Sequence, residues 1–270
     1  MKFITSVLIV LSLFAFILSC SSDDNLMNQD QITENPSDSD GNPIDTSENT
    51  KPTGTSANDL LSETQYEKLV LEIVYVEGFK PTENTIAAFR NFLINRLKKS
   101  QGVDIEMREI PSPEKSRYTI QDIISQEINN RTKYTNGNEI AVFAMFLDGD
   151  YADNTQNSSV LGIAYRNTSF VIFEKTVKDF TQGVLAPSLE VLETTVVNHE
   201  FGHLLGLVNA GSPLQSDHQD TEHGKHCTEQ DCLMYYTAET GEGIINMLSG
   251  GSVPSLDAQC IADLQANGGK

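Results

Sequence analysis

The residues best suited to chemistry lie in the stretch 199–206, which reads His-Glu-Phe-Gly-His-Leu-Leu-Gly. Two histidines four residues apart on a helix project from the same face, so His199 and His203 can reach one metal ion. Glu200 lies beside that ion, where its carboxylate can take a proton from a water molecule whose pKa zinc lowers toward ~7. Gly206 is suited to end the helix, because glycine readily adopts the left-handed conformation. The spacing predicts a zinc site with Glu200 as general base.

A catalytic zinc ion has three protein ligands and leaves its fourth position to water, so one more ligand must come from elsewhere in the chain. The polar loop that follows the helix contains several side chains that bind zinc. The candidates for the third ligand are Asp217, His218, His223 and His226.

The run 226–234 reads His-Cys-Thr-Glu-Gln-Asp-Cys-Leu-Met. It resembles the pattern of the archaemetzincins, which are metzincin zinc metallopeptidases: His-Cys, four residues, Cys, one residue, Met. The matrixins are similar in the eight-residue step from the third histidine to the methionine, and in a Leu-Met-Tyr like that at 233–235. The resemblance covers residues 189–236. It implies that His226 is the third zinc ligand and that Met234 belongs to the Met-turn beneath the metal.

The loop before His226 departs from the metzincin pattern. Metzincins place the third ligand three residues after the helix glycine, where this chain has Asn209, a poor zinc ligand. Residues 208–225 would then be an insertion, and His218 within it is the alternative third ligand. Tyr236 stands where astacin-type metzincins have a tyrosine that reaches the metal. It is therefore either a transition-state stabiliser or a packing residue.

The cysteines depart from the archaemetzincin pattern as well. That family has a later Cys-x-x-Cys that completes a second, four-cysteine zinc site. This chain has only Cys260 after Met234, so we do not predict that site. In an exported protein, a disulfide between Cys227 and Cys232 is the simpler expectation.

The N-terminus is typical of an export signal. Lys2 precedes an apolar run over residues 3–18, and Ser19 precedes Cys20. The end of this run resembles a bacterial lipobox, in which the cysteine is lipidated and the acyl chains anchor the protein in the membrane. We therefore predict a lipoprotein signal peptide over residues 1–19. The expected location is the bacterial outer membrane, with the protein facing the periplasm or the cell surface.

A polar segment follows the signal. Residues 21–60 contain nine acidic side chains and one basic one, and they have too little apolar surface to offset the entropy of folding. We predict that residues 20–60 are the lipidated cysteine and a disordered acidic tether. The net charge of the chain is −20, and residues 61–270 carry −13 of it, which argues against nucleic acid as a partner.

Residues 61–270 suit a single catalytic domain. Strands are predicted at 69–76, 103–107, 139–147, 160–165 and 169–173, and helices at 81–99, 120–134, 187–207 and 256–264. The β-α-β-α-β order implies a largely parallel sheet, while the short link 166–168 forces its two strands to pair antiparallel near an edge. The predicted class is α/β (α+β), with a metzincin-like twisted mixed sheet, an antiparallel edge strand, an active-site helix, a Met-turn and a C-terminal helix.

These features and the resemblance together predict a zinc-dependent endopeptidase. The edge strand 160–165 resembles the metzincin strand that aligns an extended substrate by β-addition. We expect a protein or peptide substrate, zinc as the cofactor and a monomeric chain. The alternative is a surface-anchored zinc-binding lipoprotein without peptidase activity, which the displaced third ligand and the histidine-rich insertion suggest.

Overall fold

A five-stranded sheet forms the centre of the computed structural model, which describes residues 36–37, 43–156, 158–183 and 186–270. Its strands, in the order β2-β1-β4-β7-β6, are β1 (Lys68–Val76), β2 (Val103–Ile110), β4 (Glu139–Phe146), β6 (Gly162–Arg166) and β7 (Ser169–Ile172). The first four in this order pair in parallel, and β6 pairs antiparallel with β7 at the edge. The predicted mixed, largely parallel sheet with an antiparallel edge strand is confirmed.

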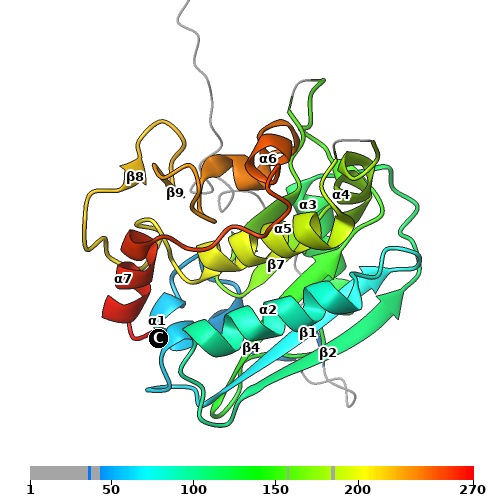
Figure 1. The fold of residues 1–270 in the computed structure, drawn as a ribbon. Coiled ribbons are helices and arrows are strands. Elements are labelled where there is room, and N and C mark those ends of the chain that lie inside the picture. Colours follow the sequence, from blue (N-terminus) through cyan, green and yellow to red (C-terminus); the bar gives the residue numbers. More distant parts are fainter. Residues whose placement is uncertain (1–35, 38–42, 157, 184–185) are drawn as a thin grey trace, which may run out of the picture.

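Helices cover both faces of the sheet (Figure 1). They are α2 (Glu83–Arg96) and α5 (Leu189–Leu204) on one face and α3 (Ile120–Asn130) on the other. Side chains alternate along each strand, so Ile73 in β1 packs in the core beneath α2 and α5, whereas Val74 packs in the core beneath α3.

Helix α5 begins after Ser188, whose hydroxyl accepts a hydrogen bond from the backbone N–H of Val191. Every residue of α5 from Leu192 onward is buried. Phe201 anchors this helix, because its ring makes edge contacts with Phe89 of α2 at 5.4 Å and Phe170 of β7 at 6.4 Å between centroids. The sheet and α2 together hold the helix that carries both histidines.

Short elements complete the domain. They are η2 (Ser47–Asn49), α1 (Ala57–Leu61), β3 (Arg117–Tyr118), β5 (Asp150–Tyr151), α4 (Glu174–Phe180), β8 (Gln219–Asp220), β9 (His226–Cys227), η3 (Tyr236–Glu239), α6 (Gly241–Met247) and α7 (Ala258–Ala266). Of these, α7 is the C-terminal helix expected at 256–264. The paired strands β8 and β9 arise inside and directly after the insertion.

The folded region begins before residue 61, so the predicted end of the tether is too late. Asn49 is fully buried, and its side-chain amide donates to the backbone oxygen of Ala141 and to the hydroxyl of Thr168, both at 3.0 Å. The hydroxyl of Thr53 donates to the backbone oxygen of Ala164 at 3.0 Å. Polar residues hold this segment on the sheet through hydrogen bonds, which a composition-based prediction of disorder does not detect.

The predicted signal peptide and Cys20 lie outside the described residues, as does about half of the predicted tether. Within the part of the chain that the structure describes, no helix has the length and apolar character needed to cross a membrane.

Candidate metal centre and active site

Three histidines meet where α5 ends and β9 passes beside it. His199 and His203 are one turn apart on α5, and their Nε2 atoms are 3.1 Å apart. The ring of His226 in β9 lies 5.3 and 5.1 Å from those two rings between centroids. The three rings offer nitrogen atoms that all lie within 4.8 Å of one another. One ion at about 2.0–2.1 Å from each nitrogen fits such a group.

Backbone carbonyls orient two of these rings. Nδ1 of His199 lies 2.7 Å from the carbonyl oxygen of Leu233, and Nδ1 of His226 lies 2.6 Å from that of His223. A ring that donates its Nδ1–H to a carbonyl keeps the lone pair on Nε2, which is the arrangement that metal-binding histidines adopt. The donor set of three buried imidazoles therefore fits zinc.

Glu200 is fully buried and its side chain lies against the backbone of the edge strand β6. A Cβ atom at Gly162 would lie 2.7 Å from both Cγ and Oε1 of Glu200, closer than real contacts of this kind. Gly162 therefore provides the space that the carboxylate occupies between α5 and β6. A glycine inside an apolar strand was the available sequence signal, because it often marks a close approach.

Met234 packs against helix α5 at Gly202. A Cβ atom at Gly202 would lie 2.4 Å from its sulfur, so the side chain packs directly on the α5 backbone. The N–H of Cys227 donates to the carbonyl oxygen of Met234 at 2.8 Å. This bond ties β9, and with it His226, to the turn.

Gly206 turns the chain away from the helix, as predicted. Its φ of +68° is left-handed, and its N–H donates to the carbonyl oxygen of His203 at 3.0 Å. Asn209 lies outside the histidine group: its side chain is exposed and donates to that of Gln219. Asp217 is also exposed and outside this group.

His223 and Tyr236 form a stacked pair beside the metal centre. Their ring centroids are 3.7 Å apart and their planes differ by 1°. Nδ1 of His223 lies 2.6 Å from a carboxylate oxygen of Asp220. His223 is therefore not one of the three converging imidazoles, and it contributes its carbonyl group to the orientation of His226 instead.

His218, the alternative third ligand, lies in a different cluster. Its Nδ1 is 3.4 Å from the sulfur of Cys227, and its Nε2 is 2.8 Å from a carboxylate oxygen of Asp263. The structure thus brings His226, and not His218, to His199 and His203.

The expected disulfide between Cys227 and Cys232 is absent, since both are free thiols and so is Cys260. The physical reason is the convergence of several elements: α7 brings Cys260 to within 3.7 Å of the sulfur of Cys232, and the insertion brings His218 to Cys227. The cysteines therefore belong to one polar cluster rather than to an isolated pair.

No family model matches the sequence, and no curated protein matches it. Among solved structures, the fold is similar to archaemetzincin from Methanopyrus kandleri, with a TM-score of 0.48 and 16% identity over 76% of this chain and 96% of that one. It is also similar to a zinc-dependent peptidase from Methanocorpusculum labreanum, with a TM-score of 0.43 and 13% identity over 72% and 99% of the two chains. A third similar structure is metalloproteinase-II from Bacteroides fragilis, with a TM-score of 0.40 and 14% identity over 76% and 54%.

The arrangement combines a place for one metal ion with a neighbouring carboxylate. The three histidines would hold a zinc ion, and such an ion would supply the positive charge that activates water and polarises a carbonyl group. Sequence reasoning found the three histidines and Glu200. It did not find the carbonyl groups of Leu233 and His223, because backbone acceptors have no sequence signal.

Proposed function

We propose that this protein is a zinc-dependent endopeptidase of metzincin type. His199, His203 and His226 hold the zinc ion, and Glu200 is the general base. The observation that carries the proposal is the convergence of three imidazoles next to a buried glutamate that faces the edge of a sheet. A purely structural zinc site has no use for a carboxylate that is not a ligand in that position.

Zinc bound at this centre would supply Lewis acidity to the scissile carbonyl group and would lower the pKa of water. A carboxylate oxygen of Glu200 takes a proton from the attacking water and then delivers it to the leaving amine nitrogen. The edge strand β6 is the last strand of the described sheet, where it pairs with β7. An extended peptide added along its outer edge would bring its carbonyl group toward Glu200, which lies against Gly162 of the same strand.

The proposal extends to the location of the protein. The export signal and the lipobox-like sequence before Cys20 support a lipid-anchored, exported chain. We expect it to act as a monomer on proteins or peptides outside the cytoplasm.

The full chain with Glu200→Gln tests the proposed reaction. The zinc content should equal that of the wild type, while hydrolysis of a broad peptide library should fall by ~10²–10⁴-fold, which is the usual contribution of a general base. Glu190→Gln is the matched control, because Glu190 is an exposed glutamate on the same helix. It should retain full activity.

Near-normal hydrolysis by Glu200→Gln would refute the role of Glu200. A wild-type chain that binds zinc at the three histidines but hydrolyses no peptide of the library would instead support the zinc-binding lipoprotein.

A further inference from the structure

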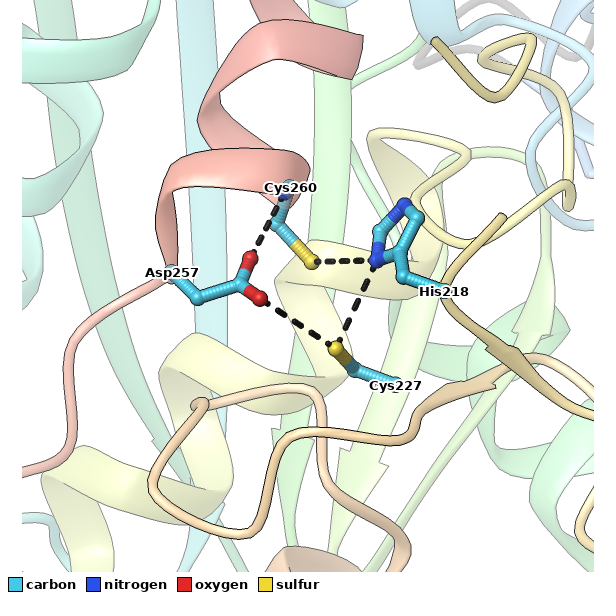
Figure 2. A group of neighbouring side chains, drawn as sticks. All are labelled: His218, Cys227, Asp257 and Cys260. Carbon is cyan, nitrogen blue, oxygen red and sulfur yellow. Dashed lines mark hydrogen bonds between the residues drawn. The ribbon is translucent and has the colours of Figure 1, made fainter. Parts of the chain in front are cut away.

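A second group of metal-binding side chains lies next to the histidine centre and shares no residue with it. Figure 2 shows His218 of the insertion, Cys227 of β9, and Asp257 and Cys260 at the start of α7, with their side chains pointing toward one another. One potential ligand atom from each lies within 4.8 Å of the others. The sulfur of Cys232 is 3.7 Å from that of Cys260, which adds a third thiol to the group.

Three distances between the sulfur and nitrogen atoms of this cluster match those of a tetrahedral zinc site. Zinc bonds of about 2.3 Å to sulfur and 2.0–2.1 Å to nitrogen place two sulfurs about 3.8 Å apart, and a nitrogen about 3.6 Å from a sulfur. The two thiols of Cys232 and Cys260 are 3.7 Å apart. Nδ1 of His218 lies 3.4 Å from the sulfur of Cys227 and 3.9 Å from that of Cys260.

His218 is oriented as a ligand. Its Nε2 lies 2.8 Å from a carboxylate oxygen of Asp263, and both side chains are fully buried. A ring that donates Nε2–H to a carboxylate keeps its lone pair on Nδ1, the atom that faces the sulfurs. The other carboxylate oxygen of Asp263 accepts the backbone N–H of Gln215 at 2.7 Å, which fixes the insertion to α7.

Asp257 has a different role in this cluster. One of its carboxylate oxygens accepts the backbone N–H of Cys260 at 2.7 Å and so caps the first turn of α7. The other oxygen is 3.5 Å from the sulfur of Cys227. Asp257 is also only partly buried, whereas His218 is buried. These contacts favour His218 as the nitrogen ligand and Asp257 as the helix cap beside the site.

We propose that Cys227, Cys232, Cys260 and His218 bind a second, structural zinc ion. Soft thiolate sulfurs and an imidazole select zinc, and four protein ligands leave no open position for water. The ligand set differs from four cysteines, because the fourth ligand comes from the insertion, 42 residues before Cys260. This inference does not depend on peptidase activity.

The structural zinc ion would also position His226, which is the third ligand of the zinc ion at the histidine centre. Cys227 directly follows His226 in β9, and its N–H is bonded to the turn at Met234. Cys232 lies two residues before Met234 and brings the turn into the same centre. The structural ion would thus hold both β9 and the turn where the histidine centre needs them.

The metal content of the full chain tests this proposal without an activity assay. The wild type should bind two zinc ions per chain. His199→Ala/His203→Ala should bind one, and its cobalt-loaded form should show the intense near-ultraviolet absorption of cobalt–thiolate bonds. Adding Cys260→Ser or His218→Ala to that double variant should remove the cobalt–thiolate absorption and weaken zinc binding by at least tenfold.

Asp257→Asn in the same background is the matched control, because asparagine also caps helices. It should keep the absorption. Since a ligand variant can also fail to fold, the wild type provides a second measurement: zinc should protect Cys227, Cys232 and Cys260 from alkylation, and a chelator should expose them.

A double variant without bound zinc or cobalt–thiolate absorption would overturn the proposal, as would alkylation that is insensitive to zinc. Loss of the absorption in Asp257→Asn but not in His218→Ala would overturn the assignment of the nitrogen ligand.

Discussion

The side chain of Glu200 fills the space that a side chain at position 162 would need, and the glycine there determines where the carboxylate lies. The carboxylate of Glu200, the proposed general base, has a buried position because the facing strand has no side chain at that point. The identity of a residue on β6 therefore controls the position of a residue on α5. This dependence gives the first prediction.

Gly162→Ala should lower kcat/KM for peptide hydrolysis by about 10²-fold, because an added Cβ displaces Glu200 and small misplacements of a catalytic group cost that much. The zinc content should not change, since Gly162 is not a ligand. Kinetics with a fluorescent peptide and metal analysis measure both quantities. Gly250→Ala is the control, because Gly250 has open space around its Cβ position and should tolerate alanine without loss. Full activity of Gly162→Ala would show that Glu200 does not need this space.

At the scale of the elements, a pair of buried carboxyl groups joins α4 to α5. Glu174 and Glu193 are both fully buried, and the hydroxyl of Thr85 donates to Glu193 at 2.6 Å. Burial and the neighbouring Glu193 raise the pKa of Glu174 well above its usual value. The folded protein therefore keeps Glu174 protonated at pH values at which the unfolded chain, with a pKa near 4.5 for this group, has released the proton.

Glu174→Gln should flatten part of the pH dependence of stability. Because the folded state binds one more proton than the unfolded state above pH ~4.5, the free energy of unfolding of the wild type falls as pH rises from there toward the raised pKa. Glutamine keeps a neutral hydrogen-bonding group in place and does not titrate. The difference between variant and wild type in urea unfolding should therefore grow in favour of the variant from pH 5 to pH 9. Parallel curves for the two proteins would show that the pKa of Glu174 is not raised in the folded state.

The longer elements could be predicted from sequence because their apolar periodicity is sustained. The strands β1 and β4 are nearly all apolar, and α2 and α3 carry regular apolar residues. The helices α4 and α6 have seven residues each, which is too short for a periodic signal, and α6 includes two glycines. The polar segment that contains Asn49 joins the fold through hydrogen bonds, so its composition predicted disorder instead.

The candidate site was likewise predictable only where its residues lie close together in the sequence. His199, Glu200 and His203 lie on one helix, where spacing alone determines direction, and His226 has a short tether to the turn at Met234. The cluster of His218 and the three cysteines was not predictable, because it forms only when α7 packs against the insertion. Its histidine and its third cysteine are far apart in the sequence and have no common motif.

At the scale of the whole molecule, the described domain is the part outside the proposed anchor. Cys20→Ser should move the protein from the membrane fraction to the soluble fraction after cell disruption, because the acyl chains that supply membrane affinity would be missing. Peptide hydrolysis by the released chain should equal that of the wild type. Immunoblots of the two fractions measure the distribution, with Ser21→Ala as control. Unchanged membrane partitioning of Cys20→Ser would refute the lipid anchor.

The central claim is that zinc binds between α5 and β9 on His199, His203 and His226. Anomalous diffraction from crystals of the zinc-loaded full chain, recorded on both sides of the zinc absorption edge, tests it most directly. We predict a peak at about 2.0–2.1 Å from one nitrogen of each of these three histidines, with Glu200 close by but outside bonding distance. The absence of a peak between His199 and His203, or a peak there that is bonded to His218 instead of His226, would contradict the claim.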